Sequence, residues 1–566
     1  MDQERAFSGS IAGMSSAYTG RGGRGGPRAK IVIATAAIVV MAVVLALTVF
    51  APGSGQAPRR MESIFQDDKY LLYQPSTQTV SNVLDALRSL GADRIRTDVL
   101  WGPISPDSTS KTEPAGFDAT NPSAYPAGGW APYDRLVQLA TARHIGVDFD
   151  LIGSGPLWAM TPGSPERKLA NHYEPSSAEF AQFVSAVGRR YSGSYTPHGA
   201  SQPLPRVSYW SIWNEPNQPG WLAPQYRRVS GQRVMASPVL YRGLVDAAFG
   251  ALQRTGHGTS TDTILIGELA PEGDFGSPPS EIPIPPLPFL RAMYCLDGDY
   301  KPLQGQTADA LRCPSGGHSA AFAAAHPALF GATGFSHHPY SFDLPPAEQF
   351  SDPSFVPLSD LSRLEHALDR TFAAYGVHRQ IPLYLTEYGY ETDPPNPTKG
   401  RFTPSQQSGF LNQAQYMAWR DPRVRAFSQF LLVDSLPNTH YSPSNVNRYW
   451  STFQTGLLYA SGKTKPSYHS YPLPIFIPDP SFAPGRRVFV WGMLRLAPND
   501  TLQHAAIQWR PLHGRRFRTL ETVSTHDPDG FLTVRLTLPG TGAVRIAWTS
   551  RTGRQFQSRA VGVRSK

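Results

Sequence analysis

The sequence predicts an α/β protein built as a (β/α)8 TIM barrel, followed by a small all-β sandwich and preceded by one N-terminal transmembrane helix. Between residues 62 and 475, short β-branched or aromatic runs alternate with amphipathic helical runs, which is the pattern of repeated βαβ units. Beyond a proline-rich linker the helical periodicity disappears and short alternating runs take over. Near the N-terminus, residues 31–50 form an uninterrupted run without charge.

The segment before residue 62 is expected to lie outside the globular fold. Residues 31–50 are apolar and as long as the roughly 20 residues that cross a bilayer as a helix. Basic residues precede this run, so the positive-inside rule leaves the Gly-rich, disordered tail 1–30 in the cytoplasm and exports everything beyond the linker 51–61. The alternative is a cleaved signal peptide and a secreted protein, although the apolar core of such peptides is usually shorter.

The barrel region, residues 62–475, contains eight expected strands with helices between them. The strands are residues 62–66, 94–100, 146–152, 207–213, 263–268, 334–338, 383–387 and 426–433. The helices are residues 79–90, 133–144, 177–191, 239–254, 358–375 and 404–419. This alternation over about 400 residues is typical of an enlarged barrel. An open, doubly wound sheet is the alternative, but no Gly-rich phosphate loop follows any early strand.

Residues 275–330 form a proline-rich segment that is expected to be an insertion after the fifth strand. It contains Cys295 and Cys313, which are the two cysteines of the chain. An exported protein meets an oxidising compartment, so these two residues are predicted to form a disulfide. Two cysteines without a CxxC spacing are poor evidence for a metal site.

The C-terminal region, residues 476–566, is predicted to be a small β-sandwich. Several prolines between residues 472 and 484 mark the linker, and four short alternating runs follow at 487–496, 505–509, 532–538 and 543–548. Carbohydrate-binding modules often take this form, and Trp491, Trp509 and Trp548 offer rings for sugar stacking. Packing in a core is the favoured role for aromatic residues in such short strands.

The charge of the chain does not predict a nucleic-acid partner. Lys and Arg number 52 against 43 Asp and Glu, a formal charge of +9. Much of the excess lies at the two ends of the chain, and no basic stripe interleaved with aromatic residues runs through its middle.

The strongest local motif is Trp213-Asn214-Glu215-Pro216-Asn217, which closes the expected fourth strand. A carboxylate that follows a barrel strand lies on the face where barrel active sites are built. Among aromatic neighbours such a carboxylate is partly desolvated, which suits a general acid. The competing interpretation is a structural turn carboxylate, which Pro216 would favour.

A second glutamate, Glu387, closes the expected seventh strand in the run Leu385-Thr386-Glu387-Tyr388-Gly389-Tyr390. Strands four and seven lie on roughly opposite sides of a barrel mouth, so Glu215 and Glu387 are expected to face one ligand. Two carboxylates that flank one bond are what glycoside hydrolysis requires.

These motifs resemble those of the clan A glycoside hydrolases, most closely families 39 and 5, in an exported member of actinobacterial type. The resemblance implies that Glu215 is the acid/base, that Asn214 binds the sugar 2-hydroxyl and that Glu387 is the nucleophile. Arg96 matches an arginine on strand two that steadies the nucleophile. His338 and Tyr340 match the His-x-Tyr of strand six, whose tyrosine bonds the nucleophile.

One departure from the clan concerns its tryptophan at the end of strand eight, where this chain has Leu432-Val433-Asp434. Either Trp158 or Trp450 substitutes for it, or the glycone subsite has an unusual shape. Trp101, Trp130, Trp158 and Trp221 are expected in or near loops at the catalytic face, with sugar stacking by two of them, and Trp101 and Trp158 are assigned to substrate binding. His337 and His338 are adjacent on a strand and point to opposite faces, so a shared metal ion is not expected. Neither a metal nor another cofactor is predicted.

The predicted activity is hydrolysis of an O-glycosidic bond in an oligo- or polysaccharide by double displacement, with retention of anomeric configuration. The carbohydrate substrate and the membrane are the predicted partners, and the catalytic region is expected outside the cytoplasm. Two alternatives remain open, a non-catalytic carbohydrate-binding barrel and a transglycosylase of envelope glycans. The sequence makes no prediction of the oligomeric state or of the sugar.

Overall fold

The computed structural model describes residues 61–566, apart from residues 165–166, 275–281, 315–318 and 500. The predicted tail 1–30, the predicted transmembrane segment 31–50 and all but the last residue of the linker 51–61 lie outside the described residues. Within the described part, no helix is both long enough and apolar enough to span a bilayer.

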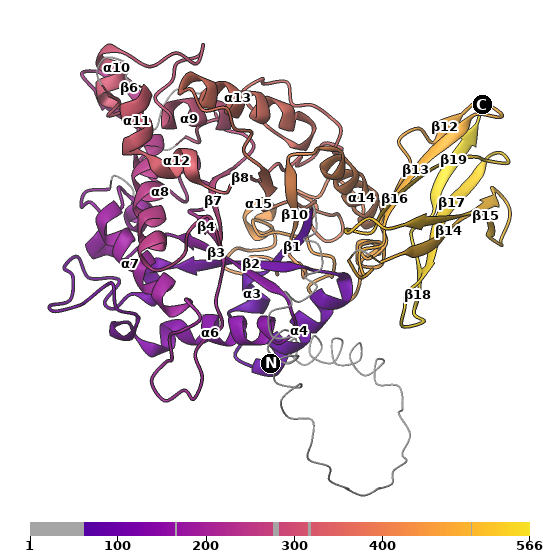
Figure 1. The fold of residues 1–566 in the computed structure, drawn as a ribbon, viewed down its shortest axis with the longest axis horizontal. Coiled ribbons are helices and arrows are strands. Elements are labelled where there is room, and N and C mark those ends of the chain that lie inside the picture. Colours follow the sequence, from indigo (N-terminus) through magenta and orange to yellow (C-terminus); the bar gives the residue numbers. More distant parts are fainter. Residues whose placement is uncertain (1–60, 165–166, 275–281, 315–318, 500) are drawn as a thin grey trace, which may run out of the picture.

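Eight parallel strands close into a barrel in the order β1-β10-β9-β8-β7-β4-β3-β2, which confirms the predicted TIM barrel (Figure 1). The strands are β1 (Glu62–Gln66), β2 (Arg94–Leu100), β3 (Gly146–Ile152), β4 (Tyr209–Ile212), β7 (Thr263–Leu269), β8 (Gly334–His337), β9 (Leu383–Leu385) and β10 (Val424–Phe430). All eight correspond to expected strands. The expected ends at residues 213, 338, 387 and 433 lie beyond the observed pairing, because the chain leaves the sheet there to build the barrel mouth.

The helices that surround the barrel follow their strands as the sequence pattern indicates. The longer ones are α4 (Thr77–Leu90), α6 (Ala127–Thr141), α7 (Ser177–Arg190), α8 (Ser237–Arg254), α13 (Leu361–Ala374) and α14 (Pro404–Arg420). Short helices lie in the loops at α3 (Asp68–Leu71), α5 (Trp101–Ile104), α15 (Val446–Tyr449) and α16 (Pro466–Ser470). The hairpin of β5 (Tyr226–Val229) and β6 (Gln232–Met235) has no counterpart among the expected elements.

Local sequence signals set the ends of these helices. The Ser76 side chain accepts a hydrogen bond from the backbone of Thr79 at the start of α4. The helix ends at Gly91, whose φ of 87° is the left-handed conformation that glycine adopts most readily. At α14, Thr403 and Gln406 form a capping box with a proline in the first turn.

The proline-rich insertion lies between β7 and β8, as predicted. Its described residues form α9 (Pro286–Met293), α10 (Gly305–Ala310), α11 (Ser319–Ala325) and α12 (Pro327–Gly331). The predicted disulfide between Cys295 and Cys313 is formed within it.

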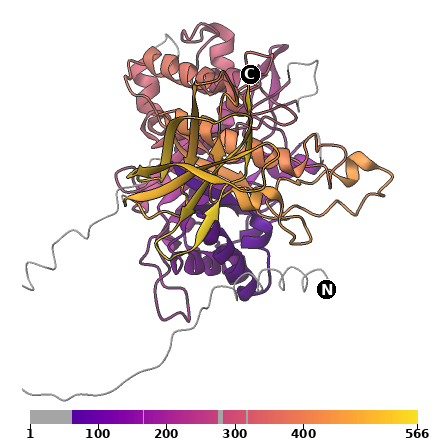
Figure 2. The same cartoon turned by 90° about the vertical axis from the view of Figure 1, so that its right-hand side faces the viewer.

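The C-terminal region forms two β-sheets beside the barrel (Figure 1), and in Figure 2 these strands face the viewer in front of it. One consists of β11 (Ile475–Phe476), β13 (Arg487–Met493) and β16 (Phe531–Thr537). The other contains β12 (Ser481–Phe482), β19 (Val561–Ser565), β17 (Gly542–Thr549), β14 (Gln503–Pro511) and β15 (Arg518–Thr525), with β18 (Gln555–Gln557) paired to β17.

Aromatic packing joins this region to the barrel. Trp491 is fully buried, and its ring lies 6.0 Å from that of Trp419 and 5.7 Å from that of Tyr416, both on α14. Trp509 and Trp548 are buried within the sandwich, so all three predicted tryptophans pack in cores. None of the three therefore offers its ring face to a sugar.

A buried arginine adds polar contacts at the same junction. Arg495 donates from Nε to the Tyr471 carbonyl at 3.0 Å and from Nη2 to Gln415 Oε1 at 2.8 Å, and it also bonds Ser63 at the base of β1. The backbone N–H of Met61 donates to Asp529 Oδ2 at 3.0 Å. The start of the barrel is therefore attached directly to the C-terminal region.

Candidate active site

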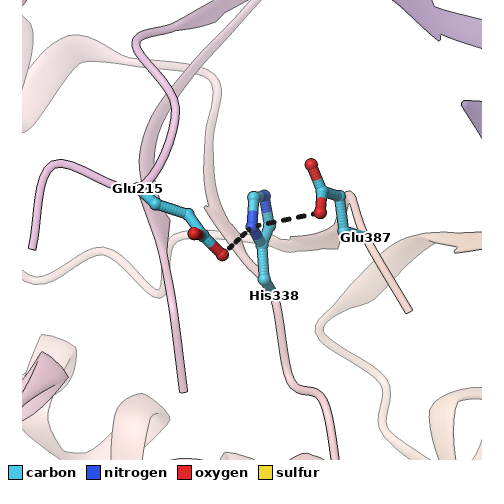
Figure 3. Close-up of side chains that lie close together, drawn as sticks. All are labelled: Glu215, His338 and Glu387. Carbon is cyan, nitrogen blue, oxygen red and sulfur yellow. Dashed lines mark hydrogen bonds and ion pairs between the residues drawn. The ribbon is translucent and has the colours of Figure 1, made fainter. Parts of the chain in front are cut away.

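Glu215 and Glu387 open into one cavity of about 710 Å³ at the carboxyl ends of the barrel strands. Glu215 follows β4 and Glu387 follows β9, so they come from separate sides of the barrel and meet at His338 (Figure 3). One oxygen of each carboxylate and one ring nitrogen of His338 all lie within 4.8 Å of one another. Asn214 and Tyr340 also line this cavity.

The backbone around Glu215 leaves the strand through a tight turn. Trp213 and Glu215 have φ values of 64° and 37°, a left-handed conformation that is rare for residues other than glycine. The N–H of Glu215 donates to the Glu268 carbonyl at 3.0 Å, and the Trp213 ring is buried 5.3 Å from Phe180. Tertiary packing therefore holds this strained turn, which is a common feature of functional sites.

Both oxygens of Glu387 are held by hydrogen bonds. Oε1 accepts from Arg96 Nη1 at 2.9 Å, and Oε2 accepts from the Tyr340 hydroxyl at 3.0 Å. Burial raises the pKa of Glu387 above its ordinary value, although the positive charges of His338 and Arg96 act in the opposite direction.

His338 is fully buried and bridges two carboxylates. Its Nδ1 donates to Glu215 Oε1 at 3.0 Å and its Nε2 donates to Glu268 Oε2 at 2.8 Å, while Glu387 Oε2 lies 3.7 Å from Nδ1. Burial alone would lower the pKa of His338, but the charge of Glu387 and the bonds to Glu215 and Glu268 raise it to about 10. His338 is therefore an imidazolium at neutral pH.

The distances among Glu215, His338 and Glu387 would admit a metal ion. A histidine ligand must, however, present a neutral nitrogen with a free lone pair. Both ring nitrogens of His338 face carboxylates at hydrogen-bond distance, which is the arrangement of a protonated ring. These residues fit a charge network better than a metal centre.

Arg96, fully buried on β2, connects the site below the cavity. Its Nη2 donates to Asp150 Oδ2 at 2.7 Å, to Glu268 Oε2 at 3.1 Å and to Asn214 Oδ1 at 3.1 Å. Its Nη1 bonds Glu387 and Gln66. The bond to Asn214 occupies the amide oxygen, so the NH2 group of Asn214 is the one left to donate to a ligand.

Glu268 is a site residue that the sequence analysis missed. It lies near the end of β7, is fully buried, and accepts from His338, from Arg96 and from the Thr386 hydroxyl at 2.7 Å. Burial by itself would raise the pKa of Glu268, but Arg96 and His338 lower it well below its ordinary value. Its position at the end of the expected fifth strand was the available signal.

Two further carboxylates, Asp68 and Asp98, line the cavity near β1 and β2. The Gln66 amide donates to Asp68 Oδ2 and to Asp98 Oδ1, each at 3.2 Å. Burial raises the pKa of both carboxyls, and that of Asp98 is raised far above its ordinary value.

The expected substrate-binding tryptophans lie elsewhere. Trp101 is fully buried and stacks on Phe183 at 5.9 Å, and Trp158 packs edge-on against Trp101 with its Nε1 donating to the Pro106 carbonyl. Neither lines the described cavity: Phe180 and Phe183 of α7 cover Trp101, and Trp158 packs against Trp101 and Phe117. Its aromatic lining comes instead from the side chains of Trp221, Tyr340, Phe342, Phe430 and Phe453.

Arg96 and His338 also stand behind the cavity lining. They contact Glu215, Glu387 and Asn214 rather than the open space. Beyond the end of β10, Asp434 is also absent from the cavity lining, because it is buried in an ion pair with Lys465 at 2.7 Å. Phe430 and Phe453 line the cavity there instead.

The raised pKa of His338 predicts a pH-dependent contribution to stability. The folded pKa of about 10 lies above the ordinary 6.5, so this contribution is complete below about pH 6.5 and is lost as the pH rises towards 10. We expect the melting temperature of His338→Gln to lie well below that of wild type at pH 7.5, and this difference in melting temperature to become smaller at pH 10. Melting curves at the two pH values measure the difference.

His337 offers the matched control for this measurement. It points away from the site and donates from Nε2 to the Val356 carbonyl at 2.7 Å, and burial lowers its pKa to about 4. Since His337 is neutral at both pH values, the melting temperature of His337→Gln should differ from that of wild type by the same amount at pH 7.5 and at pH 10. A difference for His338→Gln that is equally constant would contradict the imidazolium.

No family model and no curated protein matches the sequence. Solved structures that match include exo-β-1,4-mannosidase Op5Man5 from Opitutaceae bacterium strain TAV5, at 13% identity and a TM-score of 0.38 over 74% of this chain. This chain spans 60% of that mannosidase. A family 51 α-L-arabinofuranosidase from Bifidobacterium longum matches at 12% identity and a TM-score of 0.41, over 85% of this chain and 95% of that one.

A family 1 β-glucosidase from Thermotoga maritima is similar at 13% identity and a TM-score of 0.42, over 71% of this chain and 93% of that one. All three are glycoside hydrolases. At these identities and TM-scores they do not assign an activity to the chain.

Proposed function

We propose that this protein is a retaining glycoside hydrolase in which Glu387 is the nucleophile and Glu215 the acid/base. The observation that carries the proposal is the separation of the two carboxylates, whose nearest oxygens lie within 4.8 Å. Retaining enzymes hold the two carboxyls about 5–5.5 Å apart, whereas inverting enzymes need about 6.5–9.5 Å to admit a water.

In the first step, a Glu387 oxygen attacks the anomeric carbon while Glu215 gives its proton to the departing glycosidic oxygen. A glycosyl ester forms on Glu387 and the leaving group departs as an alcohol. Arg96 and Tyr340 hold Glu387 through both oxygens, which fixes the direction of attack.

In the second step, Glu215 removes a proton from water, and that water attacks the anomeric carbon from the side that the leaving group vacated. Esterified Glu387 no longer carries a charge at this stage. His338 stays hydrogen-bonded to Glu215 Oε1 at 3.0 Å and to Glu268 Oε2 at 2.8 Å, which keeps the Glu215 carboxyl in place beside the water. The ester bond to Glu387 breaks, which releases the sugar and regenerates the Glu387 carboxylate and protonated Glu215.

The cavity charge bears on the substrate. Besides Glu215 and Glu387, its lining carries Asp68, Glu272, Asp343 and Glu391, against Lys399 and Arg401. Asp98 also lines the cavity, but burial favours its neutral form. An acidic sugar would meet like charge there, so we propose an oligo- or polysaccharide of uncharged or amine-bearing sugars as the substrate.

The stereochemistry of the product tests the mechanism. The first-formed sugar, observed by NMR before it mutarotates, should have the anomeric configuration of the substrate. An inverted product would refute the double displacement, and binding without any turnover would favour the non-catalytic barrel. Products longer than the substrate would favour the transglycosylase.

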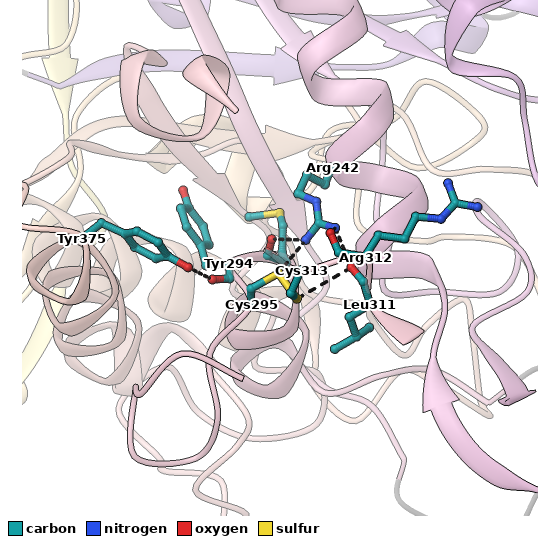
Figure 4. The surroundings of a disulfide bond; sticks show 8 residues. Arg242, Tyr294, Cys295, Leu311, Arg312, Cys313 and Tyr375 are labelled. Atoms are coloured by element: carbon teal, nitrogen blue, oxygen red, sulfur yellow. Dashed lines mark hydrogen bonds between the residues drawn. A yellow bond between two sulfur atoms is a disulfide. The ribbon is translucent and has the colours of Figure 1, made fainter. Parts of the chain in front are cut away.

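We further propose that the enzyme works outside the cytoplasm, tethered by residues 31–50. The disulfide supports export, because such bonds persist in oxidising compartments. Arg242 on α8 donates from Nη1 to Cys295 Sγ at 3.2 Å and from Nη2 to the Leu311 carbonyl at 2.6 Å, which ties the bridge to the barrel wall (Figure 4).

Cell fractionation tests this location. We expect the full chain in the membrane fraction, open to protease added outside intact cells, and residues 51–566 alone to be soluble and active. A mature N-terminus beyond residue 50 would favour the cleaved signal peptide. Full-length protein with two free thiols in the cytosol would contradict export.

A further inference from the structure

The C-terminal region differs in charge from the rest of the chain. Residues 476–566 hold fourteen Lys and Arg but five Asp and Glu, a formal charge of +9 that equals that of the whole protein. The barrel region, residues 62–475, has 31 basic and 36 acidic side chains. Within residues 62–566, the positive charge therefore belongs to the β-sandwich and not to the barrel.

Part of this charge gathers on the outer side of one sheet. Trp509 on β14 points into the sandwich, so its neighbours Gln508 and Arg510 point outward, and Arg545 on β17 is the cross-strand partner of Gln508. The guanidinium carbons of Arg510 and Arg545 lie 5.3 Å and 4.1 Å from the centre of the Phe517 ring.

The loop between β14 and β15 adds two exposed arginines to this surface. The basic face is defined here as the side chains of Arg510, Arg515, Arg516 and Arg545. Arg515 and Arg516 immediately precede Phe517 in the chain, which places them beside the stacked pair.

Neutral groups hold two guanidiniums of the basic face, those of Arg510 and Arg545, in place. Arg545 donates from Nε to Gln508 Oε1 at 2.8 Å and from Nη1 to Gln557 Oε1 at 2.6 Å, and Arg510 donates to the Gly514 carbonyl at 2.8 Å. Among the described residues, none of the four arginines forms an ion pair with an acidic side chain. The charges of Arg510 and Arg545 are thus held in place, and none of the four charges is neutralised by an acidic side chain among the described residues.

We propose that the basic face binds an acidic polysaccharide, a polymer bearing carboxylate or phosphate groups. The planar guanidinium matches these groups through two parallel hydrogen bonds, and stacking on Phe517 limits the freedom that binding must remove. The catalytic cavity is acidic, so the polymer bound here is not the one that is cleaved. It holds the enzyme in place while the cavity acts on another glycan.

A membrane surface fits these observations less well. The exposed apolar residues of the region are Leu502 and Leu512, which stand at opposite ends of β14 and so about 30 Å apart. Exposed Arg487 and Arg535 lie on the other sheet, and Arg487 bonds the Arg535 carbonyl. One flat bilayer cannot contact both sheets, whereas a flexible chain can.

Nucleic acid is disfavoured by the aromatic residues. Single-stranded nucleic acid binds to exposed rings on which bases stack. Trp509 and Trp548 are buried, and the face of Phe517 is occupied by arginine.

Binding of the full chain, kept in a non-ionic detergent, to immobilised polygalacturonate tests the proposal, with neutral dextran as reference. Wild type should bind polygalacturonate and not dextran, and its affinity should fall steeply between 50 and 200 mM salt, as for other polyanions. The variant Arg510→Gln/Arg515→Gln/Arg516→Gln/Arg545→Gln should lose at least about tenfold in affinity.

The matched control removes the same charge from the barrel surface, in Lys111→Gln/Arg228→Gln/Arg254→Gln/Lys301→Gln. It should bind within about twofold of wild type. Should the four-site sandwich variant fold poorly, Arg515→Gln/Arg516→Gln changes exposed loop residues only and should still weaken binding severalfold.

Equal binding to dextran, an equal loss in the barrel control, or tighter binding to anionic vesicles or DNA than to polygalacturonate would overturn the proposal. Hydrolysis of a small aryl glycoside should be unchanged in all these variants. A protein that binds polygalacturonate as expected but hydrolyses no glycoside would count against the proposed catalysis alone.

Discussion

Replacing Glu387 by glutamine should reduce the hydrolysis of aryl glycosides by at least about 10⁴-fold, the size of loss that follows removal of a covalent nucleophile. The amide keeps the shape of the side chain and an acceptor for Arg96 or Tyr340, which both bond the wild-type carboxylate. The fold should therefore survive while the attacking group is lost. Steady-state kinetics and a melting curve of the same preparation measure the two effects.

Azide distinguishes the roles of the two glutamates. In Glu387→Gly, azide fills the space of the missing carboxylate and attacks directly, so the product should be a glycosyl azide of inverted configuration. In Glu215→Ala, the glycosyl ester still forms and azide takes the place of water, so the azide product should have retained configuration. The opposite pairing of variants and products would exchange the two roles.

Glu391→Gln is the matched control for Glu387→Gln. Glu391 also lines the cavity beyond β9, and it accepts a hydrogen bond from the Gln454 backbone at 2.7 Å that a glutamine oxygen can also accept. We expect less than about a tenfold loss of activity, because Glu391 has no part in the proposed covalent chemistry. If Glu387→Gln and Glu391→Gln lost similar amounts of activity, the activity would depend on the negative charge of the cavity and not on a single nucleophile.

The barrel was predictable from the sequence because six of the eight strands are followed by a long helical run whose apolar spacing differs from that of the strand. The same patterns place Glu215 and Glu387 at strand ends, and closure of the sheet brings these ends to one mouth. Two residues 172 positions apart thus approach to within 4.8 Å without any local signal of their contact.

Burial is what the sequence did not reveal. Trp101 and Trp158 follow strands as site residues do, but Phe180 and Phe183 of α7 cover Trp101, and no local pattern indicates which helix face covers a loop. The sequence did not reveal Glu268 because burial, and not a local pattern, makes it part of the site. It has no neighbouring motif, and its role depends on contacts with Arg96, His338 and Thr386 from three other parts of the chain.

Arg96 carries the largest expected effect on stability. It is the buried cation that faces Asp150, Glu268 and Glu387 at 2.7–3.1 Å. Arg96→Met would leave these carboxylates without it, and removing one partner of a buried charge group typically costs about 3–5 kcal/mol. Urea unfolding at pH 7 should show a loss of this size. Arg143→Met is the control, because its pair with half-exposed Asp85 is worth about 0–1 kcal/mol.

The loss caused by Arg96→Met should depend on pH in a defined direction. Arg96 lowers the pKa of Glu268 in the folded protein, so the stability it confers through Glu268 is present above the unfolded pKa of about 4.3 and is lost as the pH falls further. Wild type and Arg96→Met should therefore converge in stability as the pH is lowered from 7 to below 4. Arg96→Lys keeps the charge, but a single ammonium cannot reproduce the forked bonds to Asp150 and Glu387, so it should fall between the two. An Arg96→Met protein as stable as wild type at pH 7 would show that the carboxylates take up protons readily enough to dispense with the cation.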